Sequence, residues 1–413
     1  MNILLGVYAC EPHNGSEPEV GWQMANELAK AMPEHRFYAI TKENNREKIE
    51  NEKYPDNLKF FYYDPPKWMT FWKKGGRGIR TYYYIWMIGA VRYMKRQKID
   101  FDLVHHITFV NDWLPSFFVL MKNDKNRFVW GPIGSHDPID KKFLDGTKRQ
   151  LIEKIRIFLQ FWFRTFDPFF YFCKKNADCV IGINDNVRKK LRLTGGKPCF
   201  AAEPAIGMKK SAVERMGRRE KDDEIFRIVS VGRLVYIKNF KMTILAFSRF
   251  LKRNPGIENV KLEIIGEGED RRSLESLAAS LGIADSVEFV GKIPLNEVQE
   301  RFEESDLFLF PTLENAGFVI LEAMSHGLPV LAMEYGGPQQ FVGHHKSEQL
   351  VSPDLPYQKI AEALADRIER FYTDRKLRED VGARNRKDVL ENFTWEAKAQ
   401  KMKGIYEKVW NEA

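Results

Sequence analysis

Short apolar runs alternate with segments of helical periodicity along nearly the whole 413-residue chain, and the alternation occurs in two series. Strands that alternate with helices form parallel sheets with helices on both faces. The sequence therefore predicts an α/β protein with two doubly wound, Rossmann-like sheets. The strands of the first series are expected at residues 2–7, 36–40, 58–62, 103–106, 128–130 and 179–182, and those of the second begin at residues 226, 261, 287, 307 and 329.

Residues 208–224, which separate the two series, are polar and charged with little apolar periodicity, as is typical of a connection between domains. We therefore expect an N-terminal domain at residues 1–207 and a C-terminal domain at residues 208–394. Residues 395–413 have the apolar spacing of one further helix.

The opening MNILLGVYAC lacks a basic leader and predicts a first buried strand instead of a signal peptide. No run of about 18 uninterrupted apolar residues occurs, so we expect no membrane-spanning helix. The four cysteines have neither metal-ligand spacing nor the spacing of a redox pair, and we expect no disulfide framework. These features favour a cytoplasmic protein. The cysteines are Cys10, Cys173, Cys179 and Cys199.

Two glutamates flank a glycine-containing turn in the second series. The apolar run before Pro311 predicts a strand, so Glu314 is expected in a strand-to-helix loop and Glu322 about two turns inside the helix. A helix that begins near Ala316 or Gly317 points unpaired N–H groups and the positive end of its dipole at a ligand, which suits an anion. Carboxylates accept hydrogen bonds from sugar hydroxyls, so the pattern predicts a nucleotide sugar.

Two basic residues follow the strand expected at residues 226–231. Gly232 ends this strand, and Arg233 and Lys238 precede the next helix. A guanidinium and an ammonium group can neutralise a diphosphate, and each charge-assisted bond contributes roughly 1.5–3 kcal/mol. Together they could hold a leaving nucleoside diphosphate.

Motifs in both halves resemble those of the retaining glycosyltransferases of family 4, which have the GT-B fold. The C-terminal motifs are GRL with Lys238, IIGEGEDRRSLESLAASLGIADSVEFVGKIP, the two glutamates, EAMSHGLPV and YGGP. The N-terminal motifs, YACEPHNGSEPEVGW, HHITFVNDWLPS and FVWGPIGS, resemble a branch associated with bacterial surface polysaccharides such as lipopolysaccharide or capsule. In this family the last helix crosses back onto the first domain.

The resemblance implies a metal-independent hexosyltransferase (EC 2.4) that needs no cofactor besides a UDP- or GDP-linked donor sugar. It implies retention by front-face departure and attack, in which the leaving diphosphate helps to deprotonate the acceptor. It assigns the chemistry to Arg233, Lys238, Glu314 and His106. It assigns donor contacts to Gly15, Ser16, Gly232, Lys292, Ile293, Ala316, Gly317, Phe318 and Glu322, and the acceptor side to His13, Glu17, His105 and Trp113.

Four residues need comment beside the family pattern. Ser16 replaces the second glycine of the first loop, and Gln340 occupies a position that is often glutamate. Strand alternation sends His105 and His106 to opposite faces, which leaves open which of them reaches the sugar; we favour His106.

Other interpretations are less favourable. Gly266 and Gly268 lack the third glycine of a dinucleotide-binding loop and predict a plain turn. Asp100 and Asp102 spell a metal-binding DxD motif but precede an apolar run, which favours a solvated loop. Two other functional classes remain as alternatives to a transferase: a nucleotide-sugar-binding protein without turnover, and a sugar-nucleotide epimerase.

The surplus of positive charge lies in the first half. Residues 1–207 contain 33 Lys and Arg against 23 Asp and Glu, and residues 67–98 contain nine basic and no acidic residues among several aromatic ones. A later helix carries one narrow polar stripe, formed by Arg149, Glu153, Arg156, Gln160 and Arg164, between wide apolar faces. So wide an apolar arc needs burial on several sides or a lipid interface. We expect an anionic membrane surface, and a glycan or lipid-linked acceptor there, in preference to nucleic acid.

Overall fold

The computed structural model describes residues 1–73, 75, 78–193, 198–217, 224–315 and 317–411. The chain divides into two compact units. Unit 1 consists of Met1–Ser135, Lys154–Gly207 and Trp395–Ala413, and unit 2 of His136–Glu153 and Met208–Thr394. Residues 136–153, which the sequence boundaries assign to the first domain, therefore cluster with unit 2.

Unit 1 is built on a seven-stranded parallel sheet in the order β3-β2-β1-β4-β5-β6-β7. Its strands are β1 (Asn2–Gly6), β2 (Arg36–Thr41), β3 (Leu58–Tyr62), β4 (Leu103–His106), β5 (Arg127–Ile133), β6 (Cys179–Gly182) and β7 (Cys199–Ala202). Its helices are α1 (Ser16–Ala31), α2 (Arg46–Glu50), α3 (Lys67–Thr70), α4 (Ile79–Arg96), α6 (Pro168–Asn176), α7 (Asp185–Lys190), α17 (Trp395–Asn411) and most of α5 (Thr147–Phe166).

Unit 2 holds a six-stranded parallel sheet in the order β10-β9-β8-β11-β12-β13. Its strands are β8 (Phe226–Val231), β9 (Val260–Ile265), β10 (Val287–Gly291), β11 (Leu307–Leu309), β12 (Val330–Met333) and β13 (Leu350–Val351). Its helices are α8 (Lys210–Arg215), α9 (Phe240–Arg253), α10 (Arg271–Ser280), α11 (Leu295–Glu304), α12 (Phe318–Ser325), α13 (Gly336–Phe341), α14 (Lys346–Gln349), α15 (Tyr357–Thr373) and α16 (Arg375–Asn392).

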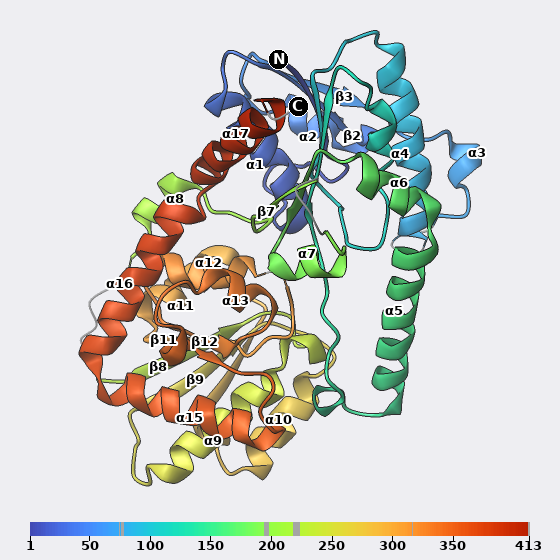
Figure 1. Cartoon of the computed structure of the whole chain (residues 1–413). Helices are drawn as coiled ribbons and strands as arrows, with labels where there is room; N and C mark the ends of the chain where they lie inside the picture. Colours follow the sequence, from blue (N-terminus) through green and yellow to red (C-terminus); the bar gives the residue numbers. More distant parts are fainter. Residues whose placement is uncertain (74, 76–77, 194–197, 218–223, 316, 412–413) are drawn as a thin grey trace. The chain divides into compact units, whose positions relative to one another are not determined.

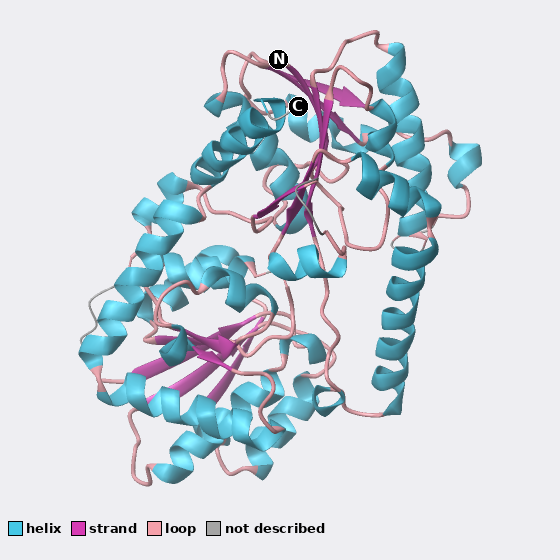
Figure 2. Ribbon diagram, in the orientation of Figure 1, coloured by secondary structure: helices cyan, strands magenta, loops and turns pink. Residues whose placement is uncertain are grey.

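Both sheets confirm the doubly wound parallel architecture (Figures 1 and 2). The strands of the two sheets are mostly buried, as parallel strands covered on both faces must be, and the edge strands β7 and β10 are the least buried. The final helix, α17, packs on α1 within unit 1, and the buried Tyr406 anchors it there. Among the described residues, no helix combines the length and apolar character needed to cross a membrane.

One expectation about the core of unit 1 was wrong. Cys179 and Cys199 form a disulfide, because β6 and β7 pair in a register that places them opposite each other. The aromatic residues of α4 do not face outward: Tyr83 and Trp86 are wholly buried under the sheet, whereas Trp68 of α3 is exposed. Within the basic segment of residues 67–98, the inner face of α4 therefore belongs to the core, whereas Trp68 and Phe71 are exposed.

The Asp100 and Asp102 pair has a structural role. The carboxylate of Asp102 accepts a hydrogen bond from the backbone N of Asn2 (2.7 Å), and its carbonyl accepts one from Arg127 N (2.9 Å). These bonds join the amino ends of β1, β4 and β5, at the edge of the sheet opposite to the one where doubly wound folds bind ligands.

Candidate active site

The central strands of unit 2 bring the predicted charged residues to one edge. β8 pairs with β11, and β11 with β12, so the loops that follow these strands are neighbours. The loop after β8 carries Arg233 and Lys238, the loop after β11 carries Glu314, and the turn after β12 carries Gly336. The carboxyl ends of parallel strands are where ligands bind in folds of this class.

Gly266 and Gly268 hold the Arg233 loop close to the next strand. A Cβ atom at Gly266 would lie 1.9 Å from the carbonyl oxygen of Gly232, and one at Gly268 would lie 2.3 Å from that of Leu234. The backbone N of Leu234 also donates to the carbonyl of Glu267 (2.9 Å). These glycines therefore serve close backbone approach in a turn.

Lys238 and Glu314 form an ion pair. Lys238 lies at the end of the 3₁₀ turn Tyr236–Lys238, and its Nζ donates to Glu314 Oε2 at 2.5 Å. Both side chains are largely buried, with 13% and 18% of their surface exposed. The two loops are also joined by a bond from Leu313 N to the carbonyl of Ile237 (2.8 Å). Without a ligand, each charge of the pair satisfies the other.

The YGGP turn fixes the Glu314 loop from the other side. The carbonyl of Glu314 accepts a hydrogen bond from Gly337 N (2.9 Å). Gly336 has φ +60°, and a Cβ atom there would lie 2.2 Å from the same carbonyl. Gln340 donates its amide N–H groups to the carbonyls of Asn315 (3.4 Å) and Gly336 (3.2 Å). An ionised glutamate could not donate these bonds, which gives the departure from the family pattern a physical reason.

Helix α12 begins at Phe318, after Gly317, and has eight residues. Glu322 is its fifth residue, so it lies one turn inside the helix and not two as expected. The carboxyl is partly buried, and burial raises its pKa to about 7. No hydrogen bond or ion pair of this carboxylate is found within the described residues. Ala316 lies outside the described residues.

The remaining donor-side predictions in unit 2 lie at the same sheet edge. Arg233 is exposed, and Lys292 and Ile293 follow β10, with Lys292 exposed and Ile293 half-buried. Gly291, which precedes them, accepts a hydrogen bond from Gly266 N (2.8 Å), which ties the β10 loop to the β9 turn. The unit thus brings together one guanidinium, one lysine–glutamate pair, a helix N-terminus and a second glutamate.

In unit 1, the first loop is longer than expected, because nine residues separate β1 from Ser16. Gly15 has φ +46° and Ser16 has φ +53°, and both are exposed. His13 is also exposed and pairs with Glu52 (3.0 Å). We retain the assignment of Gly15 and Ser16 to the donor as a prediction.

Two acceptor-side predictions, Glu17 and Trp113, have clear structural roles in unit 1. Glu17 Oε1 accepts a hydrogen bond from Phe109 N (2.6 Å), and burial raises the pKa of Glu17. Phe109 has φ +64°, which is rare for an aromatic residue. Trp113 is buried beneath Arg80, whose guanidinium lies 4.5 Å from the centre of the indole ring.

The histidine doublet is wholly buried, and its rings point to opposite faces of the sheet as expected. His105 lies between the hydroxyl of Tyr406 and the carbonyl of Gly131, both at 2.6 Å. His106 Nε2 lies 2.7 Å from the hydroxyl of Tyr83. Burial lowers the pKa of His105 to about 4 and that of His106 to about 3, so both rings are neutral at pH 7. The preference for His106 beside the sugar stays a prediction.

Sequence reasoning missed a polar cluster in unit 1. The carboxylate of Asp112, which is 1% exposed, accepts a hydrogen bond from Ser135 Oγ (2.9 Å) and lies within 4 Å of Arg164 and Lys190. Asp112 and Ser135 belong to the two N-terminal branch motifs, NDWLPS and GPIGS. Asp112 N also donates to the carbonyl of Gly134 (3.0 Å), so this cluster joins the two motifs.

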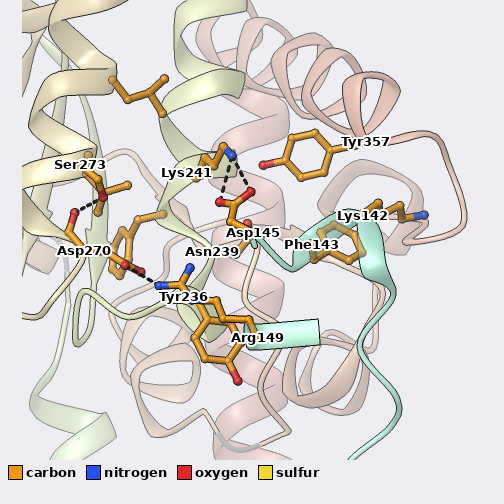
Figure 3. A pocket seen from close by; sticks show the side chains of 13 residues that line it. Lys142, Phe143, Asp145, Arg149, Tyr236, Asn239, Lys241, Asp270, Ser273 and Tyr357 are labelled. Atoms are coloured by element: carbon orange, nitrogen blue, oxygen red, sulfur yellow. Dashed lines mark hydrogen bonds and ion pairs between the residues drawn. The ribbon is translucent and has the colours of Figure 1, made fainter. Parts of the chain in front are cut away.

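Sequence reasoning also missed how residues 136–149 attach to unit 2. The hydroxyl of Tyr335 donates to the carbonyl of Asp137 (2.8 Å), and Arg149 pairs with Asp270 (2.9 Å). A cavity of about 240 Å³ lies between this segment and α9, α10 and α15 (Figure 3). At this cavity, Lys241 Nζ of α9 forms an ion pair with the Asp145 carboxylate of the segment, at 3.0 Å. No local pattern signals these contacts, because the partners lie 96 to 198 positions apart in the chain.

Residues 214–388 match the family model described as glycosyl transferases group 1. The matched residues lie wholly within unit 2. The chain is 32% identical over 186 residues to an uncharacterised glycosyltransferase of Methanocaldococcus jannaschii, and the match covers 45% of each chain. It is 32% identical over 171 residues to the lipopolysaccharide core biosynthesis glycosyltransferase LpsE of Rhizobium meliloti, 41% of this chain and 46% of that one. The chain spans about half the length of the curated relatives it matches.

Solved structures establish the GT-B fold for the whole length. The sucrose-phosphate synthase of Thermosynechococcus elongatus superposes with a TM-score of 0.67 at 18% identity, covering 100% of both chains. The lipopolysaccharide outer core galactosyltransferase WaaB gives a TM-score of 0.60 at 14% identity, covering 99% of this chain and 100% of that one. At these identities the likeness concerns the fold alone.

Proposed function

We propose that this group 1 protein is a retaining, metal-independent glycosyltransferase that moves a sugar from a UDP- or GDP-linked donor to a glycan or lipid-linked acceptor. The observation that carries the proposal is the Lys238–Glu314 pair beside Arg233 at the carboxyl edge of the unit 2 sheet. A buried, mutually neutralising pair next to an exposed guanidinium and a helix N-terminus suits a ligand with a diphosphate and a sugar.

Donor binding would exchange the partners of this pair. The diphosphate draws Lys238 away from Glu314, and Arg233 binds the second phosphate. Glu314 is then released to accept hydrogen bonds from the hydroxyls of the transferred sugar, and the carboxylate of Glu322 accepts those of the ribose. Lys238 and Glu314 thereby exchange each other for a ligand partner, and neither is left unpaired.

Catalysis would be mainly electrostatic. As the bond from the anomeric carbon to the diphosphate breaks, negative charge grows on the phosphate oxygens beside Arg233, Lys238 and the N-terminus of α12. The leaving phosphate takes the proton of the acceptor hydroxyl, which attacks the same face of the sugar. The family resemblance also assigns a place beside the sugar to His106, which is neutral in its buried position.

The names of relatives support a role in cell-surface polysaccharide synthesis. LpsE of Rhizobium meliloti is a lipopolysaccharide core glycosyltransferase, and AmsK of Erwinia amylovora, 33% identical over 145 residues, acts in amylovoran biosynthesis. We infer a cytoplasmic enzyme at the inner face of the plasma membrane, where a lipid-linked acceptor would be presented.

A donor screen tests the proposal. A ligand at 100 times its Kd stabilises its protein by about 2.7 kcal/mol, so thermal shift with UDP-, GDP-, CMP- and ADP-sugars should select one donor class. Slow hydrolysis of that donor in the absence of acceptor should follow. Lys238→Ala should lose hydrolysis, whereas Lys252→Ala, an exposed lysine of α9, should retain it.

The same screen separates the two alternative classes. A thermal shift without release of nucleoside diphosphate would support a binding protein without turnover. Conversion of the donor to another nucleotide sugar would support an epimerase. Either outcome would overturn the proposed transferase.

A further inference from the structure

The amphipathic helix α5 has its polar face turned into the protein. Glu153 and Gln160 are 5% and 6% exposed, and Glu153 Oε1 accepts a hydrogen bond from Ile139 N (2.8 Å). Further along the same stripe, Arg164 approaches the buried Asp112 at 3.7 Å. A surface helix normally packs its apolar side inward. Here the polar stripe makes the intramolecular contacts.

The opposite side of α5 carries an exposed apolar stripe that continues onto α6. With 100° between successive residues, the exposed apolar residues of α5 fall mainly on one side, about 22 Å long at 1.5 Å per residue. Phe158, Trp162 and Phe166 follow one another along it at four-residue spacing, and their neighbouring rings are in tilted contact. We call the following residues, each 40–63% exposed, the aromatic face: Leu151, Ile152, Ile155, Phe158, Leu159, Phe161, Trp162, Phe166, Phe169, Tyr171 and Phe172.

The local folding of α6 produces the same orientation. The carboxylate of Asp167 caps α6 by accepting hydrogen bonds from Phe169 N (2.8 Å) and Phe170 N (3.3 Å). Phe170 and Cys173 then point into the core, which leaves Phe169 and its neighbours outside. A contiguous apolar surface of this extent marks a docking site.

The charge beside the aromatic face indicates which partner binds there. Residues 147–176 contain seven basic and two acidic residues, and both acids are engaged, Glu153 by burial and Asp167 as the helix cap. Lys148, Lys154 and Lys175 are exposed beside the aromatic face. In a symmetric dimer through this face, the cations of two copies would meet each other. Anionic lipid headgroups instead neutralise them, at about 1 kcal/mol for each basic residue.

We propose that the aromatic face inserts into the headgroup and upper acyl region of an anionic bilayer and holds unit 1 on the membrane. This deepens the proposed function by naming its membrane contact, and it rests on that function only for the acceptor being membrane-borne. The aromatic residues of α4, in the basic segment of residues 67–98, make no such contact, because they pack in or against the core. The lysines give a salt-sensitive attraction, and the inserted side chains give a salt-resistant one.

Vesicle co-sedimentation of the full chain tests the proposal, with phosphatidylglycerol and phosphatidylcholine vesicles at low and high salt. Wild type should bind phosphatidylglycerol vesicles and keep a fraction bound at high salt. The triple variant Phe158→Ser, Trp162→Ser, Phe166→Ser should lose at least about tenfold in partitioning and all salt-resistant binding. The matched control Leu295→Ser, an exposed apolar residue of α11, should bind as wild type.

Insertion itself is tested by brominated lipids, which quench tryptophan fluorescence only at membrane depth. Quenching should occur in wild type and disappear in Trp162→Phe, which keeps the apolar face. Equal vesicle binding by wild type and the triple variant would overturn the proposal. So would failure to bind vesicles together with a dimer that the triple variant dissociates.

The outcome is distinguishable from a failure of the proposed function. The triple variant alters no residue of the unit 2 site and should hydrolyse the donor at the wild-type rate in solution. Wild-type vesicle binding without any donor hydrolysis would remove the transferase proposal and leave the membrane surface standing.

Discussion

Glu322 is predicted to lower the stability of the ligand-free protein at neutral and alkaline pH, although its carboxylate helps to bind the donor. Burial raises its pKa to about 7 from the ordinary 4.5. Because the folded-state pKa lies above the unfolded value, the stability that this group contributes is complete below pH 4.5 and is lost as the pH rises through 7. A neutral amide at this position avoids that loss.

The size of the effect follows from the two pKa values. They differ by about 2.5 units, and each unit corresponds to about 1.4 kcal/mol, so ionisation costs about 3 kcal/mol above pH 8. Glu322→Gln should therefore be more stable than wild type by up to about 3 kcal/mol at pH 8.5. For a unit of about 200 residues this is a rise in Tm of about 6–12 °C. At pH 4.5 the two proteins should melt alike.

The same substitution should weaken binding of the donor. The glutamine amide can accept hydrogen bonds from the ribose hydroxyls, but it carries no charge. Because a charge-assisted hydrogen bond is worth about 1.5–3 kcal/mol, the Kd of the donor at pH 8.5 should rise at least about tenfold. Calorimetric melting and titration with the donor at both pH values measure the two effects. Glu300→Gln, an exposed glutamate of α11, is the control and should change neither.

Two results would refute this reasoning. A Tm difference that is equal at pH 4.5 and 8.5 would show that ionisation of Glu322 is not the cause. A variant that is less stable than wild type at pH 8.5 would show that the carboxylate has a stabilising partner in the free protein.

Three further predictions concern single positions. Arg233→Ala and Lys238→Ala should each lower turnover about 100-fold or more, since each removes charge where the diphosphate develops it; near-normal kcat in both folded variants would contradict the assignment. Asp112→Ala should lower the free energy of unfolding by about 3 kcal/mol or more, because two cations within 4 Å lose their buried carboxylate. Denaturant titration measures the free energy of unfolding, and an unchanged midpoint would contradict the prediction. Gly266→Ala should abolish the donor-induced thermal shift, because the new Cβ would lie 1.9 Å from the carbonyl of Gly232; a normal shift would show that the loop adapts freely.

Periodicity and turn residues were enough to predict both sheets. They did not predict two short strands, β13 with two residues and β7 with four. These strands are too short for an apolar pattern to stand out, and β7 is also half-exposed. The rule that parallel strands end at one edge placed Lys238 and Glu314 in neighbouring loops. It could not show that the two side chains pair, because that depends on the fold of both loops.

Non-local partners account for the rest. Cys179 and Cys199 become neighbours only through strand register, and His105 finds its partner Tyr406 301 positions away. The pattern of α5 shows one polar stripe and wide apolar faces, but periodicity is the same whichever side packs inward. Only the burial of Glu153 reveals that the polar side does.

The stereochemistry of donor hydrolysis tests the central claim most directly. With the donor selected by thermal shift, proton NMR can follow the anomeric signal of the released sugar before mutarotation mixes the anomers. The account predicts release of nucleoside diphosphate with the sugar appearing first in the anomeric configuration of the donor, and loss of this release in Lys238→Ala. First appearance of the opposite anomer, or no release from any donor by the folded wild type, would contradict it.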